Sequence, residues 1–246
     1  MKVLGVIPSR YGSTRFPGKP LVEIDGKSMI QRVYERSVES HLTRVVVATD
    51  DQRIYDHVKD FGGEVIMTSA DHHTGTDRCV EAYQLLAEGY DAVINIQGDE
   101  PVLNPKQLDL LAFCFNDEDC EIATLAVKVK TDDILFDQSK IKVVLDENKQ
   151  ALYFSRQAIP FQQLPEGQWL ENHTYYKHVG IYGFKTEILK AVGKLPPSSL
   201  EKAESLEQLR WMQNGYKIQL KITEFDSISV DTPRDIDRVL KILNNS

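Results

Sequence analysis

The amino-acid sequence predicts an α/β protein with a mainly parallel sheet covered by helices on both faces. Over the first two-thirds of the chain, short runs rich in β-branched residues alternate with longer amphipathic segments. The short runs are almost continuously apolar, which is typical of parallel strands that are buried on both faces. A chain of 246 residues can bury a substantial core. We therefore expect a single domain over residues 1–246.

The first part of the chain supplies most of the predicted sheet. Its expected strands are rich in Val and Ile and are bounded by turn or charged residues, at residues 3–8, 44–49, 64–67, 92–97, 122–129 and 142–145. Helices are expected between the early strands, at about residues 28–40, 51–61, 75–88 and 105–115. Ser28 and Asp51 each precede apolar residues spaced three and four apart, so we expect both to be N-caps.

The pattern becomes richer in strands after residue 145. Strands are expected at residues 151–155, 178–184 and 217–223, with a helix or helix pair at about 200–214 and a closing helix after Pro233. We expect a smaller lobe at about residues 150–215.

Charge and hydropathy exclude two classes of partner. A formal net charge of −8 argues against a broad nucleic-acid surface, because such binding needs many Lys and Arg contacts to phosphate. No apolar run approaches the roughly 20 residues that span a bilayer, and the run at residues 3–7 is short for a signal-peptide core. We expect a cytoplasmic protein that binds neither nucleic acid nor membrane.

A basic tract, "PSRYGSTRFPGKP", follows the first expected strand directly. It is not a P-loop, since five residues separate Gly12 from Gly18 and a proline follows Lys19. Arginine guanidinium groups bind phosphate oxygens in pairs and a lysine adds a compact charge. Arg10, Arg15 and Lys19, on a loop at the carboxyl end of a strand, therefore indicate a phosphate site suited to a triphosphate.

Two carboxylates occur at the ends of predicted elements. Asp99 follows the strand at 92–97, at the same expected sheet edge as the basic tract, and Asp231 precedes the closing helix. Carboxylate oxygens are the ligands that Mg²⁺ prefers. Asp231 is equally suited locally to an N-cap. A basic loop and two such carboxylates are the components of metal-assisted nucleotidyl transfer.

The whole chain also resembles a known enzyme family, the bacterial CMP-Kdo synthetases, which are 3-deoxy-manno-octulosonate (Kdo) cytidylyltransferases of lipopolysaccharide biosynthesis. The resemblance covers residues 3 to about 239, through the segments "IPSRYGSTRFPGKPL", "VVVATDD", "ADHHTGTDR", "NIQGDEP", "KVVLD", "ALYFSR", "KHVGIYGF", "LEQLR" and "VDTPRDI". It implies a Rossmann-like, three-layer nucleotide-diphospho-sugar transferase fold with a mixed, mainly parallel sheet and a small β-rich dimerisation lobe. It also implies a homodimer that converts CTP and Kdo into CMP-Kdo and pyrophosphate.

The resemblance assigns roles to residues that lie on the family's motifs. By this resemblance Arg10, Arg15, Lys19 and Arg78 bind the nucleotide, Asp99 and Asp231 bind Mg²⁺, and Lys19, Asp99 and Asp231 carry catalysis. The residues that it implies for the sugar are Gln97, Arg156, His178, Tyr182, Glu207 and Gln208. Arg156 and His178 can bind a carboxylate, and the neutral polar groups can form hydrogen bonds with hydroxyls. His72, His73 and His173 receive no role.

Two departures from the family keep alternatives open. Arg234 stands where many members carry an acid, and the segment 161–176 is shorter than in several members and leads into the expected sugar pocket. The acceptor could therefore be another sugar acid, 8-amino-Kdo or neuraminate. A non-catalytic nucleotide-sensing protein is the alternative from a different class.

Overall fold

The computed structural model describes residues 1–12 and 16–244, and the chain divides into two compact units. The first unit comprises Met1–Phe113 and Ser227–Ser246, and the second comprises Cys114–Asp226. The lobe expected at residues 150–215 falls inside the second unit, which begins earlier. The single domain stays a prediction. None of the helices in the described residues is long and apolar enough to cross a membrane.

Four parallel strands form the sheet of the first unit. They are β1 (Val3–Ser9), β4 (Arg44–Thr49), β5 (Val65–Met67) and β6 (Ala92–Asn95). Their order is β6-β1-β4-β5, and each neighbouring pair is parallel. Leu4, Val6 and Ile7 of β1 are completely buried, as expected of a central strand covered on both faces. The strands predicted for this part of the sequence are confirmed, with ends shifted by one or two residues.

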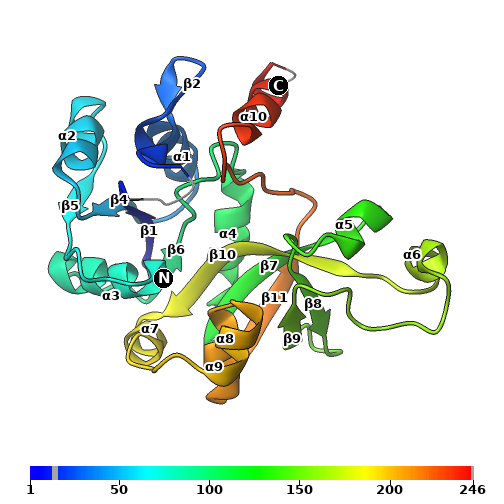
Figure 1. Cartoon of the computed structure of the whole chain (residues 1–246). Helices are drawn as coiled ribbons and strands as arrows, with labels where there is room; N and C mark the ends of the chain where they lie inside the picture. Colours follow the sequence, from blue (N-terminus) through cyan, green and yellow to red (C-terminus); the bar gives the residue numbers. More distant parts are fainter. Residues whose placement is uncertain (13–15, 245–246) are drawn as a thin grey trace. The chain divides into compact units, whose positions relative to one another are not determined.

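Helices cover both faces of this sheet (Figure 1). The covering helices are α1 (Met29–Val38), α2 (Gln52–Asp60) and α3 (Gly75–Leu86). The first unit also contains α10 (Asp235–Leu243) and all but the last residue of α4 (Pro105–Cys114). Because parallel crossovers are right-handed, α1 and α2 lie on one face, and α3, which leads back past β1 to β6, lies on the other. Both expected N-caps are confirmed, since the side chains of Ser28 and Asp51 accept hydrogen bonds from backbone N–H groups of α1 and α2.

A short hairpin between β1 and α1 was not predicted. After the 3₁₀ helix η1 (Lys19–Leu21), strands β2 (Glu23–Ile24) and β3 (Lys27–Ser28) pair in antiparallel fashion. Asp25 and Gly26 turn the chain with φ values of 48° and 74°, and Asp-Gly is the dipeptide that such two-residue turns favour. Ile24 of this hairpin packs in one buried cluster with Met29, Val230 and Val239, so the C-terminal segment rests on the N-terminal hairpin.

The second unit holds the mixed part of the fold. Its strands are β7 (Ile122–Lys128), β8 (Lys142–Leu145), β9 (Ala151–Ser155), β10 (Tyr176–Lys185) and β11 (Ile218–Ile222). Strand β7 pairs in parallel with β11 and antiparallel with β10. Strand β8 is antiparallel to both β10 and β9. A bulge between Val179 and Tyr182 interrupts β10.

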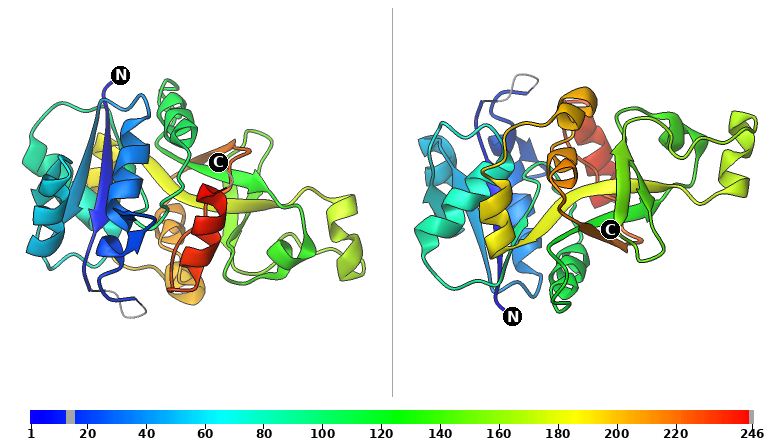
Figure 2. Two further views of the ribbon diagram at one scale, coloured as in Figure 1. Left: turned by 90° about the horizontal axis from the view of Figure 1, so that it is seen from above. Right: turned by 90° about the horizontal axis from the view of Figure 1, so that it is seen from below.

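Short helices surround these strands. They are α5 (Asp132–Phe136), η2 (Glu166–Gln168), α6 (Trp169–Asn172), α7 (Thr186–Val192), α8 (Ser199–Glu204) and α9 (Gln208–Gln213). The helix pair expected at 200–214 is confirmed as α8 and α9, drawn in orange in Figure 2. Ser205 separates them with a left-handed φ of 54°.

Candidate functional site

The order of the strands in the first unit defines where a ligand can bind. From β1 the chain passes to β4 and β5 on one side of β1, and then crosses to β6 on the other side. In open α/β sheets, ligands bind beyond the carboxyl ends of the two strands where the direction of winding reverses. Those strands are β1, which leads into the basic tract, and β6, which leads into Asp99.

Two described residues of the basic tract, Tyr11 and Gly18, meet just beyond the end of β1. The Gly18 N–H donates to the Tyr11 carbonyl at 3.0 Å. Gly18 has a φ of +71°, and a Cβ there would lie 3.1 Å from the Tyr11 ring, so this position needs glycine. The Arg53 guanidinium stacks on the same tyrosine, 3.3 Å from the centroid of the Tyr11 ring. Arg10 is exposed at the strand end, whereas Arg15 lies outside the described residues.

The structure brings Lys19, Asp99 and Asp231 together. Lys19 Nζ lies 2.7 Å from Asp99 Oδ2 and 3.9 Å from Asp231 Oδ1. The side chains of Lys19 and Asp99 are 16% and 26% exposed, and that of Asp231 is 43% exposed, so water and ligands can reach the group. Two carboxylates therefore lie beside one ammonium at this edge of the sheet.

Backbone contacts place Asp231 at this site, although it is far from Asp99 in the sequence. The Val230 N–H donates to the Asp99 carbonyl at 2.9 Å, and the buried Val230 side chain anchors the same segment. The alternative role of Asp231 as an N-cap is wrong, because the N-cap of α10 is Arg234. The carboxylate of Asp235 serves the helix start instead, accepting from the Asp231 N–H at 3.1 Å and from the Thr232 N–H at 2.8 Å.

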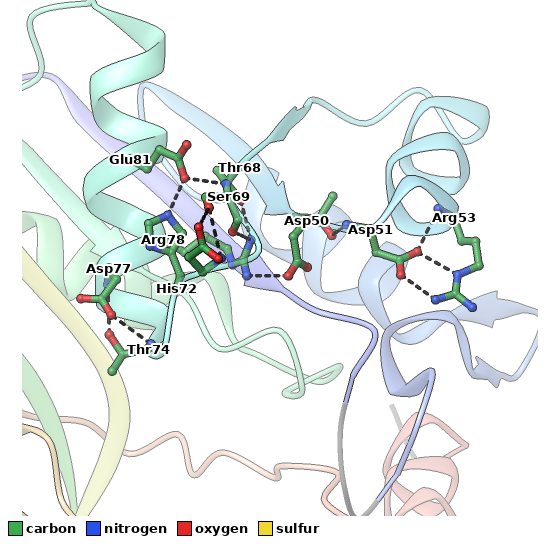
Figure 3. A network of polar contacts seen from close by, with 12 residues as sticks. Asp50, Asp51, Arg53, Thr68, Ser69, His72, Thr74, Asp77, Arg78 and Glu81 are labelled. Atoms are coloured by element: carbon green, nitrogen blue, oxygen red, sulfur yellow. Dashed lines mark hydrogen bonds and ion pairs between the residues drawn. The ribbon is translucent and has the colours of Figure 1, made fainter.

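Arg78, expected to contact the nucleotide, is an internal residue of the first unit. It is 3% exposed, and its Nη1 donates to Thr68 Oγ1 at 2.5 Å and to the Ser69 carbonyl at 3.3 Å. Its Nη2 lies 3.2 Å from Asp50 Oδ2 (Figure 3). Arg78 therefore joins the segments that follow β4 and β5. Direct contact of Arg78 with a nucleotide stays a prediction.

Two residues of this network were not singled out from the sequence. Asp50 follows β4 directly, so the rule that drew attention to Asp99 could also have found it. His72, left without a role, contacts the Glu81 carboxylate through Nε2 (Figure 3). Glu81 Oε2 also accepts from the Ser69 N–H at 2.8 Å. The segment beyond β5 is thus held to α3 from two sides.

The residues implied for the sugar fall in both units. Gln97 is a half-buried residue of the first unit, two positions before Asp99. The others belong to the second unit, namely Arg156, His178, Tyr182, Glu207 and Gln208. His178 and Tyr182 project from β10 on either side of its bulge, with ring centroids 5.1 Å apart. Arg156 directly follows β9, and Glu207 and Gln208 begin α9.

Buried polar atoms without partners gather in this part of the second unit. Within the described residues, His178 Nδ1, the Tyr182 hydroxyl and Gln208 Nε2 are buried and make no hydrogen bond. Trp211 Nε1, which the sequence did not single out, shares this property, and its ring meets Tyr182 edge-on at 4.9 Å. Buried polar groups are rarely left unpaired in folded proteins. Several such groups together therefore indicate the site of a polar ligand.

Burial also sets the charge states here. It lowers the pKa of His178 to about 3, with a smaller contribution from the charge of Lys177. His178 is thus neutral at pH 7. Because Thr124 Oγ1 donates to backbone carbonyls, the His178 proton lies on Nε2, and the buried Nδ1 can accept a hydrogen bond from a hydroxyl. Burial raises the pKa of Tyr182, and the nearby Glu207 charge raises it further, so the phenol stays protonated. Arg156 is the cationic member of the predicted sugar set.

The doubly wound sheet, with Lys19, Asp99 and Asp231 together at its switch point, is typical of nucleotide-binding α/β proteins. The cytidylyltransferase family model matches residues 4–222. A 3-deoxy-manno-octulosonate cytidylyltransferase of Parabacteroides distasonis is 52% identical over 250 residues, covering 100% of this chain and 99% of the relative. One from Thermodesulfovibrio yellowstonii is 48% identical, with 99% of each chain covered. The chain belongs to the 3-deoxy-manno-octulosonate cytidylyltransferase family, as the sequence motifs predicted.

Solved structures support the same fold. A CMP:2-keto-3-deoxy-manno-octonic acid synthetase complexed with CTP matches with a TM-score of 0.91 and 41% identity, covering 100% of this chain and 99% of the other. A putative glucose-1-phosphate thymidylyltransferase of Bacillus anthracis matches with a TM-score of 0.67 at 14% identity, covering 99% and 96%. The second likeness concerns the fold alone. The predicted nucleotidyltransferase fold with its mixed, mainly parallel sheet is confirmed.

Proposed function

We propose that this chain is a CMP-Kdo synthetase, which activates Kdo with CTP for lipopolysaccharide biosynthesis. The anomeric C2 hydroxyl oxygen of Kdo attacks the α-phosphorus of CTP. The bond between the α-phosphorus and the bridging oxygen breaks, pyrophosphate leaves, and the hydroxyl proton is released to solvent. The observation that carries this proposal is the group of Lys19, Asp99 and Asp231 at the switch point of the first unit, in a chain of this family.

Lys19 would bind the phosphates of CTP. Its ammonium is directed by Asp99 at 2.7 Å and remains partly exposed. A charge that is held in place before the reaction stabilises the charge that develops on a phosphate or on leaving pyrophosphate without costly rearrangement. Arg10, which is exposed at the end of β1, would add a guanidinium to the same anion.

Asp99 and Asp231 are the residues that would hold Mg²⁺. Both offer hard oxygen donors beside the cationic Lys19 group, and no group of three or more His, Cys, Asp or Glu suited to a metal occurs among the described residues. Mg²⁺ is commonly held by one or two carboxylates together with substrate phosphates and water. The residues present therefore fit this ion. When bound, Mg²⁺ would neutralise phosphate charge and lower the pKa of a hydroxyl.

Arg156 would bind the carboxylate of the sugar acid, and the buried polar atoms of the second unit would bind its hydroxyls. His178 Nδ1, the Tyr182 hydroxyl and Gln208 Nε2 supply neutral hydrogen-bonding groups. A site with such groups rejects analogues that leave them unpaired. This composition supports a polyhydroxylated acid as the acceptor.

The proposal includes a cytoplasmic homodimer. Its support in the structure is the exposure of large apolar side chains in the second unit, where Phe161 is 74% and Leu152 is 57% exposed. Exposed apolar side chains support a protein interface where they form one contiguous patch. Sedimentation equilibrium should give twice the chain mass. A single-chain mass at micromolar concentration would contradict the homodimer.

A substrate matrix tests the proposed function. Each of the four nucleoside triphosphates is combined with Kdo, 8-amino-Kdo and neuraminate, with and without Mg²⁺, and pyrophosphate release is recorded. We expect the highest rate with CTP, Kdo and Mg²⁺. A higher rate with 8-amino-Kdo or neuraminate would show that this sugar acid, and not Kdo, is the preferred acceptor. No turnover with any pair would favour a nucleotide-sensing protein.

A further inference from the structure

Arg156 is held in place by contacts on both sides of its peptide. Glu204 Oε2, from the last residue of α8, accepts the Arg156 N–H at 3.0 Å. On the other side, Lys142 Nζ from β8 donates to the Arg156 carbonyl at 2.7 Å. The side chains of Glu204 and Lys142 therefore bind the backbone of Arg156 from opposite sides. All three residues lie within the second unit.

Lys142 is a completely buried lysine. Its ammonium also donates to the carbonyls of Asp137 and Lys140, so its three donors meet three backbone acceptors. Burial lowers the pKa of Lys142 to about 8, the charges of Asp137 and Glu204 oppose this change, and the charge of Arg156 adds to it. An uncompensated buried ammonium is costly. Lys142 thus ties Arg156 to the turn that precedes β8.

Glu204 links Arg156 to a second predicted sugar-binding segment. Besides the Arg156 N–H, its carboxylate accepts from Ser155 Oγ at 2.7 Å, and its own carbonyl accepts from Arg156 Nε at 2.9 Å. The next residue, Ser205, turns the chain in the left-handed conformation, and Glu207 and Gln208 follow at the start of α9. The side chain and the backbone of Glu204 therefore fix the segment at residues 155–156 relative to the segment that leads into α9.

The guanidinium of Arg156 keeps its charge for a ligand. Its partners in the described residues are the carbonyls of Glu204, Gln138 and Ser205, at 2.9, 3.3 and 3.4 Å, and include no carboxylate. The Glu204 carboxylate contacts the backbone N–H of Arg156, not the guanidinium. These contacts orient the cation without neutralising it, as a site for an anionic ligand requires.

We infer that Lys142 and Glu204 are positioning residues for the acceptor sugar acid, which fix Arg156 and couple it to Glu207 and Gln208. The inference rests on the proposed function, because it takes the sugar acid as the ligand of Arg156. Neither residue needs to touch the substrate. Loss of either should weaken acceptor binding and leave CTP binding unchanged, because the group of Lys19, Asp99 and Asp231 lies in the first unit.

Glu204 offers a graded pair of variants. Glu204→Ala removes the two carboxylate oxygens that accept hydrogen bonds from the Arg156 N–H and from Ser155 Oγ. Glu204→Gln can keep both hydrogen bonds, with its amide oxygen accepting from the N–H and its amide nitrogen donating to the serine oxygen. Hydrogen bonds that involve charged groups contribute about 1.5–3 kcal/mol, or roughly 10- to 100-fold in binding. The exposed Lys202 of the same helix provides a matched control, Lys202→Ala.

The test measures kcat and both KM values with CTP and Kdo for the wild type, these variants and Lys142→Met. We expect Glu204→Ala and Lys142→Met to raise the KM for Kdo about 10- to 100-fold, with the KM for CTP unchanged. Glu204→Gln should recover to within about threefold of the wild type, as a retained hydrogen-bond pair predicts. An unchanged KM for Kdo in Glu204→Ala, or an equal rise in both KM values, would overturn the inference.

Amide hydrogen exchange separates this inference from the proposed function. In Glu204→Ala, exchange at residues 155–157 should accelerate, whereas exchange in β1 and β6 should match the wild type. A wild type without turnover of Kdo would refute the proposed function, and the exchange measurement would still decide whether Glu204 positions Arg156. Unchanged exchange at residues 155–157 would refute the positioning role in either case. Hydrogen exchange is also measured in Lys142→Met, because this variant loses buried hydrogen bonds and can lose activity by unfolding. Faster exchange at residues 155–157, with exchange in β1 and β6 unchanged, would show that Lys142 positions Arg156.

Discussion

The neutral, buried state of His178 leads to a quantitative prediction for acid stability. His178 is 7% exposed, its Nε2 lies 2.9 Å from Thr124 Oγ1, and the Phe154 ring packs edge-on at 5.1 Å. Burial lowers its pKa to about 3, whereas an unfolded histidine titrates near about 6.5. Between these two pKa values, His178 is protonated in the unfolded chain and neutral in the folded chain. The stability that His178 contributes is therefore complete above a pH of about 6.5 and is lost as the pH falls.

The size of this loss at pH 5 follows from the unfolded pKa, because the folded pKa lies well below 5. Between pH 8 and pH 5 the difference amounts to about 2 kcal/mol. The assay compares urea unfolding of the wild type and His178→Gln at pH 8, 7, 6 and 5 and constant ionic strength. The variant removes only this titration, so the gap in free energy of unfolding between the two proteins should shrink by about 2 kcal/mol at pH 5. A gap that is independent of pH would refute the neutral, buried state.

Three further predictions concern the charged groups. Lys19→Ala should lower kcat about 10²- to 10³-fold, since it removes a preorganised charge; pyrophosphate release at full rate would contradict this role. Asp99→Asn and Asp231→Asn should each raise the Mg²⁺ concentration that gives half-maximal rate, and magnesium titrations that coincide with the wild type would refute the metal site. Arg210 and Glu201 form a largely buried ion pair, so Arg210→Met should lower the free energy of unfolding by about 3–5 kcal/mol; a loss below about 1 kcal/mol in urea unfolding would show that the pair is screened.

The sequence predicted the strands and the sheet edge well, because their signals are local. Nearly continuous apolar runs define β1, β4 and β6, and the residues that follow them must lie at the carboxyl edge of a parallel sheet. The order of residues along the chain is therefore enough to place the basic tract and Asp99 at one edge. It is not enough to predict the approach of Asp231 to Lys19, which depends on the packing of Val230 against a distant hairpin.

Other contacts gave no signal in the sequence. Lys142 begins a short apolar run and resembles a solvated strand end, and only the fold shows three carbonyls converging on its ammonium. Glu204 likewise resembles an ordinary exposed helix residue. No local signal distinguishes Asp235, whose carboxylate accepts hydrogen bonds at the start of α10, from Asp231, which is locally just as suitable. Long-range contacts of this kind are set by tertiary packing, which no local pattern records.

The most direct test of the central claim is ³¹P NMR of the complete reaction, with CTP, Kdo and Mg²⁺, for the wild type and Lys19→Ala. Lys27→Ala serves as the control, since its ammonium forms a solvent-exposed pair with Glu35. The wild type and the control should form one CMP phosphodiester and one pyrophosphate for each Kdo consumed, while Lys19→Ala should be slowed about 10²- to 10³-fold. Release of inorganic phosphate and CDP, or Kdo left unchanged by the wild type, would contradict cytidylyl transfer at this site.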